Sequence, residues 1–377
     1  MAGIYIHIPW CRKVCIYCDF HFSVSLRDRK EMLDCLSAEL HMQKNYLAGE
    51  KISSIYFGGG TPSVLEAREL RILLDTIYSI FDVDCNVEIT LEANPDDLFP
   101  GYLLDISHAG INRLSLGVQS FFGEDLAWMN RRHDEAASIA CIERSISAGF
   151  TNINIDLIYG LPGMDDARWK RNLGFFFGTG VNHLSAYHLT LEEKTVYYHR
   201  VKKGILTKPD QNKGARQFEM LMDRAAREGF IHYEISNFCR PGNFSRHNTG
   251  YWLQHHYLGV GPSANSYNGG SRQWNARNNT LYIKSIKAGK IPFEYEELDK
   301  ATRYNEYILT SLRTVWGADP SYVERIFGEE YTGHFLKETD RLTGKGFIEM
   351  RKGNMVLTRE GRKLADGIIS GLFRENE

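Results

Sequence analysis

The sequence lacks long apolar runs, a strong excess of charge of one sign and a large, regularly spaced set of cysteines. Its 377 residues are 43% hydrophobic and 24% charged, as in ordinary globular proteins, and no run approaches the roughly 18 apolar residues that a membrane span needs. The formal net charge of −2 gives the whole chain no electrostatic basis for binding nucleic acid. We therefore expect neither a membrane span nor a nucleic-acid partner.

The cysteines and the first residues indicate a reducing compartment. Seven cysteines is an odd number, and their uneven spacing does not suggest a disulfide framework. The first eight residues contain neither a basic segment nor a long apolar one, so we expect no export signal and a cytoplasmic location. Three scattered cysteines are expected to be small core residues: Cys35, Cys85 and Cys141.

Short apolar segments rich in β-branched and aromatic residues recur through the first half of the chain. They are Ile4–Ile8, Ser54–Gly58, Val87–Glu92, Arg113–Gln119, Asn152–Tyr159 and His183–Leu191. The intervals suit crossover helices such as Val64–Phe81, where Ser63 and Glu66 predict a capping box. Because the segments are nearly continuously apolar, they favour parallel strands buried on both faces. Six such units predict an α/β fold with a partial (β/α)6-type barrel, and a doubly wound sheet is the alternative.

The second half of the chain has a different pattern of predicted helices and strands. A helix over Gln211–Glu228 and a strand over His232–Ser236 are followed, after about Ile291, by mostly helical segments. The predicted helices there are Ala301–Val315, Pro320–Phe327 and Gly333–Lys345, and the predicted strands are Phe347–Met350 and Met355–Thr358. Helices followed by a hairpin suggest a winged-helix-like module with a packing or lid role. We expect a barrel over residues 1–230, a connecting region over 231–290 and a helical domain over 291–377.

The most specific motif is Cys11-x-x-x-Cys15-x-x-Cys18, directly after the first predicted strand. Three thiolates on one loop can share a metal centre, and thiolates select zinc or iron–sulfur. Zinc would need a fourth ligand, and a site closed by His21 would be tighter than the usual paired spacing. A four-iron cluster held by three cysteines leaves one iron open to a cosubstrate.

Several motifs together resemble the radical S-adenosylmethionine (SAM) superfamily, in its coproporphyrinogen III oxidase-like branch. Besides the cysteine loop they are Tyr5-Ile-His-Ile-Pro-Trp-Cys, Gly58-Gly-Gly-Thr-Pro, Leu91-Glu-Ala-Asn-Pro, Leu116-Gly-Val-Gln-Ser and Tyr159-Gly-Leu-Pro-Gly. The resemblance runs from about residue 3 to the C-terminus. It implies a TIM-like radical SAM barrel, a [4Fe–4S] cluster on Cys11, Cys15 and Cys18, and bound SAM.

The resemblance also implies a set of SAM contacts. They are Tyr5, Gly60, Thr61, Glu92, Gln119, Arg131 and Asp156. The glycine-rich turn has a physical reason to bind the methionine end of SAM, because it leads into a helix N-terminus that attracts a carboxylate; a tight βα turn is the alternative. Glu92 and Asp156 can instead pair structurally with Arg113 or Arg131.

Two groups of this branch compete, the oxygen-independent coproporphyrinogen III dehydrogenases and the HemW-type heme chaperones. The dehydrogenases carry a further cysteine two residues after the third, where this sequence has Phe20, and a segment ahead of the cluster loop, which here begins at Cys11. The segment Arg246–Trp252 matches the His-Asn-x-x-Tyr-Trp motif of the chaperones. The resemblance therefore favours a heme chaperone without dehydrogenase activity, and the dehydrogenase is the alternative. Whether SAM is cleaved stays open.

The chaperone reading predicts a heme site around His247. Its imidazole can ligate heme iron, with Tyr251 and Trp252 against the macrocycle. Arg240 and Arg246 can meet the propionates. Rival ligands are Cys239, His255 and His256, and the residues alone favour a structural, hydrogen-bonded histidine at His247. We expect the imidazole to be exposed near the cluster face. The expected partners are a heme-acceptor protein and a reductase or other electron donor, with only peripheral contact to membrane heme proteins.

Overall fold

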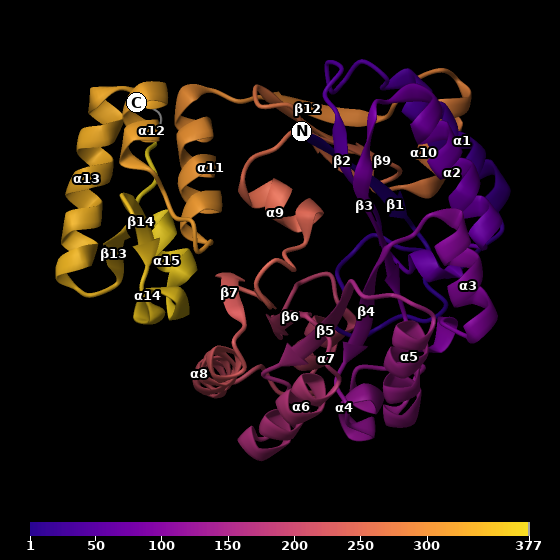
Figure 1. The fold of residues 1–377 in the computed structure, drawn as a ribbon, viewed down its shortest axis with the longest axis horizontal. Coiled ribbons are helices and arrows are strands. Elements are labelled where there is room, and N and C mark those ends of the chain that lie inside the picture. Colours follow the sequence, from indigo (N-terminus) through magenta and orange to yellow (C-terminus); the bar gives the residue numbers. More distant parts are fainter. Residues whose placement is uncertain (376–377) are drawn as a thin grey trace.

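A mixed sheet forms the centre of the computed structural model, which describes residues 1–375. Within those residues its strand order is β12-β11-β10-β9-β1-β2-β3-β4-β5-β6-β8-β7. The six predicted strands are confirmed and run parallel in sequence order (Figure 1). They are β1 (Ala2–Ile8), β2 (Ile52–Gly59), β3 (Val83–Ala93), β4 (Arg113–Gln119), β5 (Ile153–Tyr159) and β6 (His183–His188).

The alternation of side chains along β1 explains why this sheet has two buried faces. Ile4, Ile6 and Ile8 are fully buried in the main hydrophobic core, whereas Tyr5 lines an internal cavity. Successive side chains of a strand point to opposite faces, so one face of β1 packs on helices and the other faces the inside of the curved sheet. Polar side chains on that inner face form the candidate site.

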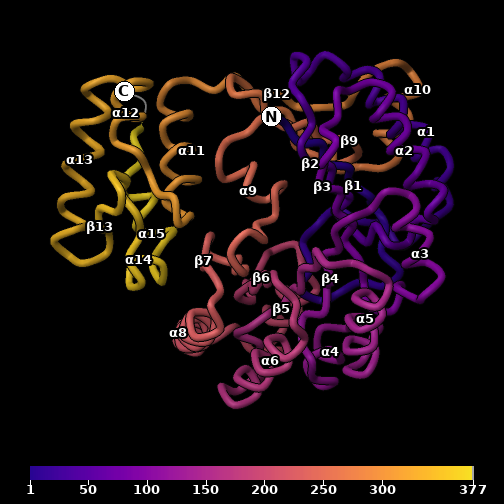
Figure 2. The backbone as a smooth tube through the Cα atoms, viewed as in Figure 1, coloured from indigo at the N-terminus to yellow at the C-terminus, as the bar shows by residue number. Residues whose placement is uncertain are grey.

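Helices cover the outer face of the sheet, as the tube in Figure 2 shows for the first 230 residues. The helices of this part are α1 (Arg29–Met42), α2 (Ala67–Ile80), α3 (Pro100–Ala109), α4 (Gly123–Trp128), α5 (Glu135–Ser147), α6 (Asp166–Gly178), α7 (Val196–Lys202) and α8 (Gln211–Arg227), with 3-10 turns η1 (Pro62–Val64) and η2 (Pro95–Asp97). The βα repeat and the partial barrel predicted from the sequence are thus present.

Two local predictions are wrong. The helix expected from residue 64 begins at Ala67, and its first turn is closed by Glu66, whose N–H donates to the Glu69 carboxylate (2.7 Å). Ser63 does not cap it, because its hydroxyl donates to Asp97 (2.8 Å). Cys85 is exposed rather than a core residue, since it lies in the first part of β3, where the strand projects beyond the core.

The strands after residue 230 extend the same sheet at both ends. β8 pairs antiparallel with β6, and β9 pairs in parallel with β1. These elements are β7 (Ile231–Glu234), β8 (Asn237–Cys239), α9 (Arg246–Trp252), β9 (Tyr257–Val260), β10 (Asn265–Tyr267), β11 (Ser271–Asn275), α10 (Asn279–Lys287) and β12 (Phe293–Glu297). The segment containing α9 lies between the barrel and the C-terminal helices in Figure 1.

The C-terminal part has a second hydrophobic core, built around Tyr304, Ile308 and Phe335. Its elements are α11 (Lys300–Leu312), α12 (Pro320–Phe327), α13 (Glu329–Gly344), β13 (Ile348–Arg351), β14 (Asn354–Leu357), α14 (Arg359–Lys363) and α15 (Ala365–Ser370). Helices followed by an antiparallel hairpin agree with the predicted element order. In residues 1–375, none of the helices combines the length and apolar character needed to cross a membrane.

A buried carboxylate fastens α1 to the extension of the sheet. Glu39 is fully buried and accepts hydrogen bonds from Gly261 N–H (2.8 Å), Asn275 Nδ2 (2.7 Å) and Tyr282 OH (2.5 Å). Burial raises the pKa of Glu39 to about 7. The native state therefore holds a proton on Glu39 at pH values where the unfolded chain has released it.

Glu39→Gln should change stability in a pH-dependent way. Because the folded pKa is raised from 4.5 to about 7, wild-type stability falls as pH rises through that window and is level above it. Glutamine does not titrate, so the wild-type advantage in free energy of unfolding should shrink by about 3 kcal/mol between pH 4.5 and pH 8. Urea unfolding measures this. The exposed Glu31→Gln on the same helix is the matched control, and a constant difference between wild type and Glu39→Gln would contradict the assignment.

Candidate functional site

The loop after β1 carries the three predicted cluster cysteines and is held on both sides by backbone hydrogen bonds. Cys11 N–H donates to Ser23 O (3.0 Å), and Trp10 O accepts from Thr61 N–H (2.7 Å) in the glycine-rich turn after β2. Gly60 is required in this turn, because a Cβ there would lie 2.5 Å from Trp10 O. The turn and the cysteine loop are therefore packed backbone against backbone.

The three thiols have different neighbours. Cys11 Sγ accepts a hydrogen bond from Thr61 Oγ1 (3.3 Å), and Cys15 Sγ accepts one from Arg131 Nη1 (3.4 Å). Burial raises the pKa of Cys11 to about 11 and that of Cys18 to about 12. A bound metal would reverse this, because its positive charge displaces the thiol proton.

The donor set of the loop consists of three thiols, and thiolates select zinc or iron–sulfur. In the part of the chain that the structure describes, no group of three or more His, Cys, Asp or Glu side chains is placed to hold a single metal ion. A four-iron cluster binds each thiolate at a different iron, so it needs three sulfurs on one loop but not a common point. Cys11, Cys15 and Cys18 would hold such a cluster, which when bound supplies an iron with an open coordination position.

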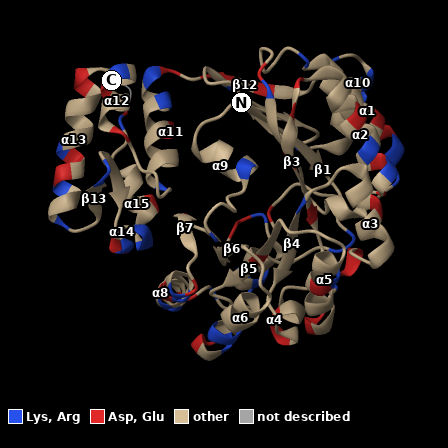
Figure 3. Ribbon diagram, viewed as in Figure 1, with Lys and Arg blue, Asp and Glu red and all other residues tan. Residues whose placement is uncertain are grey.

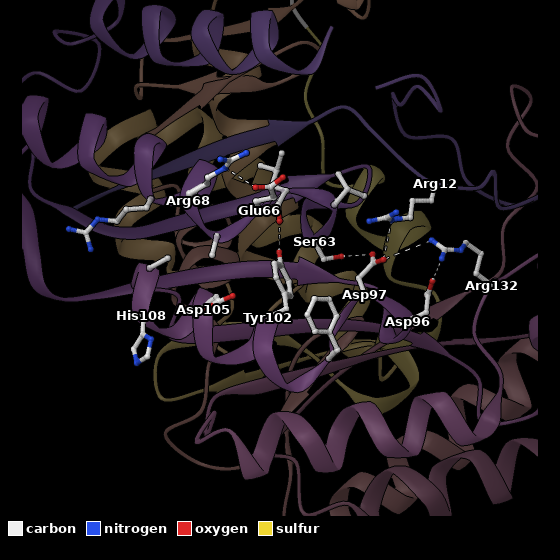
Figure 4. A pocket seen from close by; sticks show the side chains of 16 residues that line it. Arg12, Ser63, Glu66, Arg68, Asp96, Asp97, Tyr102, Asp105, His108 and Arg132 are labelled. Atoms are coloured by element: carbon white, nitrogen blue, oxygen red, sulfur yellow. Dashed lines mark hydrogen bonds and ion pairs between the residues drawn. The ribbon is translucent and has the colours of Figure 1, made fainter. Parts of the chain in front are cut away.

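A cavity of about 780 Å³ opens beside the cysteine loop, between η1, η2 and α3 (Figure 4). The charged side chains on the side of the cysteine loop form ion pairs with one another. Asp97 lies 3.3 Å from Arg12 of the cysteine loop and accepts from Ser63, and Asp96 lies 3.0 Å from Arg132. None of the predicted site residues lines this cavity. The ion pair between Arg12 and Asp97 connects the cysteine loop to η2.

A second cavity, of about 220 Å³, lies inside the curved sheet. Five predicted site residues line it: Tyr5, Glu92, Asp156, His247 and Tyr251. Glu92 accepts a hydrogen bond from Tyr56 OH (2.8 Å), and Asp156 accepts one from Asn154 Nδ2 (2.8 Å). Burial raises the pKa of Glu92 to about 7, with a further contribution from the charge of Asp156, whose own pKa burial raises to about 6.

The structural pairing considered for these two carboxylates is wrong. Arg113 is buried with its Nε 3.9 Å from Glu88, and Arg131 donates to a side-chain amide and a backbone carbonyl. Within residues 1–375, no ion pair joins Glu92 or Asp156 to a basic side chain. The charge of Arg113, which lines the same cavity, acts on Asp156 without forming an ion pair. Buried carboxylates that form no ion pair favour a cationic or hydrogen-donating ligand, and SAM carries both an ammonium and a sulfonium.

Arg131 links the cysteine loop to the end of β4. Its Nη2 donates to Asn94 Oδ1 (2.5 Å) and Gly117 O (2.7 Å), while its Nη1 contacts Cys15. Gln119 ends β4 with φ at +68°, a left-handed conformation that is uncommon outside glycine. A strained residue at a strand end next to a cofactor loop is typical of a functional position.

The structure does not support the expectation that a helix N-terminus at the glycine-rich turn attracts the carboxylate of SAM. The N–H groups of Gly60 and Thr61 donate to carbonyls of β1 and the cysteine loop (2.9 and 2.7 Å). Helix α2 begins only at Ala67 and carries Glu69 in its first turn, so its N-terminus is already compensated by a negative charge. The contact of Gly60 and Thr61 with SAM stays a prediction from the resemblance.

His247 lies at the opposite end of β1 from the cysteine loop. It is 4% exposed, with Nδ1 2.9 Å from Ser54 Oγ and Nε2 2.8 Å from Tyr251 OH. Its ring packs beside Gly3, where a Cβ would lie 3.2 Å from the imidazole. The expectation of an exposed imidazole near the cluster face is therefore wrong. Helix α9 carries His247 against the amino-terminal ends of β1 and β2.

The other residues predicted around heme are dispersed. Arg246 donates to Asn86 O (2.6 Å) and Arg240 to Glu228 O (3.2 Å). Cys239 is buried, and His256 is bonded to Glu50. Tyr251 and Trp252, in contrast, line a third cavity, between α9, the β9–β11 extension and α11.

Comparison with known proteins places the chain in a family. Residues 5–176 match the radical SAM superfamily. The chain is 34% identical to heme chaperone HemW of Mycobacterium tuberculosis over 98% of its own length and 94% of that protein. It is 32% identical to heme chaperone HemW of Bacillus subtilis over the full length of both. The chain belongs to the HemW group of the radical SAM superfamily.

The fold extends the same relationship to a solved structure. Coproporphyrinogen III oxidase (HemN) from Escherichia coli, a radical SAM enzyme, superimposes with a TM-score of 0.85 over 99% of this chain and 90% of HemN. The sequences are 23% identical, so this likeness concerns the fold. Membership of the radical SAM superfamily implies a [4Fe–4S] cluster and SAM, in agreement with the donors of the cysteine loop and the unpaired buried carboxylates.

Sequence reasoning missed several residues of this HemW-group site. Asn94 donates a hydrogen bond to Thr61 and accepts one from Arg131. Its position directly after β3, in the motif Leu91-Glu-Ala-Asn-Pro, could have indicated it. Arg113 and Tyr56 line the internal cavity. An arginine at the start of an apolar strand could have indicated Arg113.

The surface charge of the helices is mixed, since basic and acidic segments alternate along α1, α13 and α14 in Figure 3.

Proposed function

We propose that the protein is a heme chaperone that binds a [4Fe–4S] cluster, SAM and heme and delivers heme to an acceptor protein. The observation that carries this proposal is the end-to-end similarity to proteins named heme chaperones. Cys11, Cys15 and Cys18 hold the cluster in this proposal. The SAM contacts are Tyr5, Gly60, Thr61, Glu92, Gln119, Arg131 and Asp156, of which Glu92 and Asp156 accept hydrogen bonds from the ligand.

The alternative is an oxygen-independent coproporphyrinogen III dehydrogenase, and the chain shares the fold of HemN. Phe20 stands where the dehydrogenases carry a further cysteine, and this argues against that activity. The assay is anaerobic incubation of the cluster-loaded protein with coproporphyrinogen III, SAM and an electron donor. We expect no protoporphyrinogen IX, and robust, SAM-dependent formation of that product would replace the chaperone by the dehydrogenase.

A pair of variants tests whether His247 belongs to the heme site. The Tyr251 hydroxyl is hydrogen-bonded to His247 Nε2, so this nitrogen can ligate iron only if the hydroxyl moves away. We expect His247→Ala to weaken heme binding at least about tenfold and to shift the heme absorbance band, while Tyr251→Phe retains both. Absorbance titration with heme measures both effects, and the cluster absorbance shows that the fold persists. If the two variants weaken binding equally, with the wild-type spectrum, His247 acts only by placing Tyr251.

The proposed partners follow from the same role. A protein that carries heme needs an acceptor protein, and its cluster can take electrons from a reductase or another donor. Contact with membrane-bound heme proteins would be peripheral. A cytoplasmic location stays a prediction.

A further inference from the structure

The third cavity, of about 470 Å³, lies where three parts of the chain meet. Its walls come from α9, from the β9–β11 extension and from α11 of the C-terminal part, and Phe20 reaches it from the segment after the last cluster cysteine. Cavities of this size commonly hold small organic ligands. Tyr5, one of the proposed SAM contacts, and His7 line it from β1, whereas the three cysteines and the other proposed SAM contacts do not line it.

The lining is rich in aromatic side chains. Tyr251 and Tyr257 lie edge to face with ring centroids 4.5 Å apart, and Tyr257 and Tyr267 are 6.2 Å apart. Trp252 adds a further ring. Phe20 is 67% exposed, and an exposed aromatic ring at the edge of an aromatic cavity is typical of a site for an apolar ligand. This cavity can therefore accept a flat, largely apolar molecule.

The charges at the cavity complement an anion. Arg272 is paired with Glu306, so their charges cancel. Arg277 is exposed, and its guanidinium makes no hydrogen bond or ion pair to any residue among 1–375. The positive charge of Arg277 interacts electrostatically with His7, which lines the same cavity. The lining thus carries one uncompensated positive charge, suited to a carboxylate.

We infer that this cavity is the heme site, in which the macrocycle lies against Tyr257, Tyr267 and Phe20 and a propionate binds Arg277. The inference rests on the proposed function and gives it a location. It also replaces Arg240 and Arg246 as propionate partners, because neither lines the cavity. His247 lines the internal cavity and not this one, and Tyr5 and Tyr251, whose rings contact His247, line both.

Charge reversal at the cavity mouth provides the test. In the full-length, cluster-reconstituted protein, Arg277→Glu should weaken binding of ferric heme at least about tenfold, because a charge-assisted hydrogen bond becomes a repulsion. Phe20→Ala should weaken it roughly threefold to tenfold. Both side chains are exposed, so the variants should fold. Arg227→Glu, an equal charge change on α8, is the matched control and should bind heme as the wild type does.

A second probe identifies the group that Arg277 recognises. Heme dimethyl ester has no free carboxylate, so it should bind wild type and Arg277→Glu with the same affinity. Unchanged heme affinity in both Arg277→Glu and Phe20→Ala would overturn the location while leaving the chaperone proposal intact. A loss of affinity in Arg240→Glu without one in Arg277→Glu would overturn it in favour of the other arrangement. If the wild type binds no heme, the proposed function itself fails.

Discussion

Cys15→Ala should abolish assembly of the [4Fe–4S] cluster. Three thiolates from one loop are the protein's donors in this site, and two cannot retain a four-iron cluster against loss of iron. Arg131 Nη1 lies 3.4 Å from Cys15 Sγ, so the variant also leaves a buried guanidinium without its sulfur partner. After anaerobic reconstitution we expect less than about a tenth of the wild-type iron content and charge-transfer absorbance.

The matched control is Cys85→Ala, because Cys85 is an exposed cysteine outside the loop. It should retain the full iron content. Iron and sulfide analysis, with the absorbance spectrum, measures both proteins. A Cys15→Ala protein that keeps a complete cluster, or a wild type that takes up one zinc and no iron, would disprove the assignment of the loop.

Asp156→Asn should weaken SAM binding while leaving the cluster in place. Asn154 and Ser115 hold the side chain toward the internal cavity. Among the described residues it forms no ion pair, although the charge of Arg113 on the same cavity favours its ionised form, so a ligand can contact the carboxylate directly. Losing a charged hydrogen-bond acceptor costs about 1.5–3 kcal/mol, which corresponds to a tenfold to hundredfold rise in Kd. Calorimetric titration of the cluster-loaded protein with SAM measures it.

The pH dependence separates charge from shape in this experiment. Burial raises the pKa of Asp156 to about 6, so the carboxyl is neutral below that pH and resembles asparagine. The difference in SAM affinity between wild type and Asp156→Asn should therefore be small at pH 5 and grow as pH rises through 6. Asp223→Asn, on the surface of α8, is the control. Equal SAM affinity of wild type and Asp156→Asn at pH 8 would exclude this strand from the SAM site.

The central parallel strands could be predicted because each is a nearly continuous apolar segment of sufficient length. β9 to β12 could not, since they are three to five residues long and every residue of β12 is exposed. Their strand character comes from pairing with β1 and with one another. Such pairing is a tertiary effect that short segments do not encode locally.

Some features of the candidate site could likewise be predicted from the sequence, and others depend on the tertiary structure. The cysteine spacing is local, so the loop was visible in the sequence. Glu92 and Asp156 were found through the resemblance, but the absence of an ion pair at either required the fold, because Arg113 is turned toward Glu88 instead. The position of His247 depends on how α9 packs against Ser54, nearly 200 residues away in the chain, and no periodicity reports that.

β1 occupies the middle of the sheet, and its two neighbours come from distant parts of the chain. Ile52–Gly59 pairs along one side, whereas Tyr257–Val260 pairs along the other. During synthesis, the backbone groups on the second side of β1 therefore stay unpaired until β9 has been made. An incomplete chain that stops before β9 presents this edge to other molecules, and such edges template aggregation.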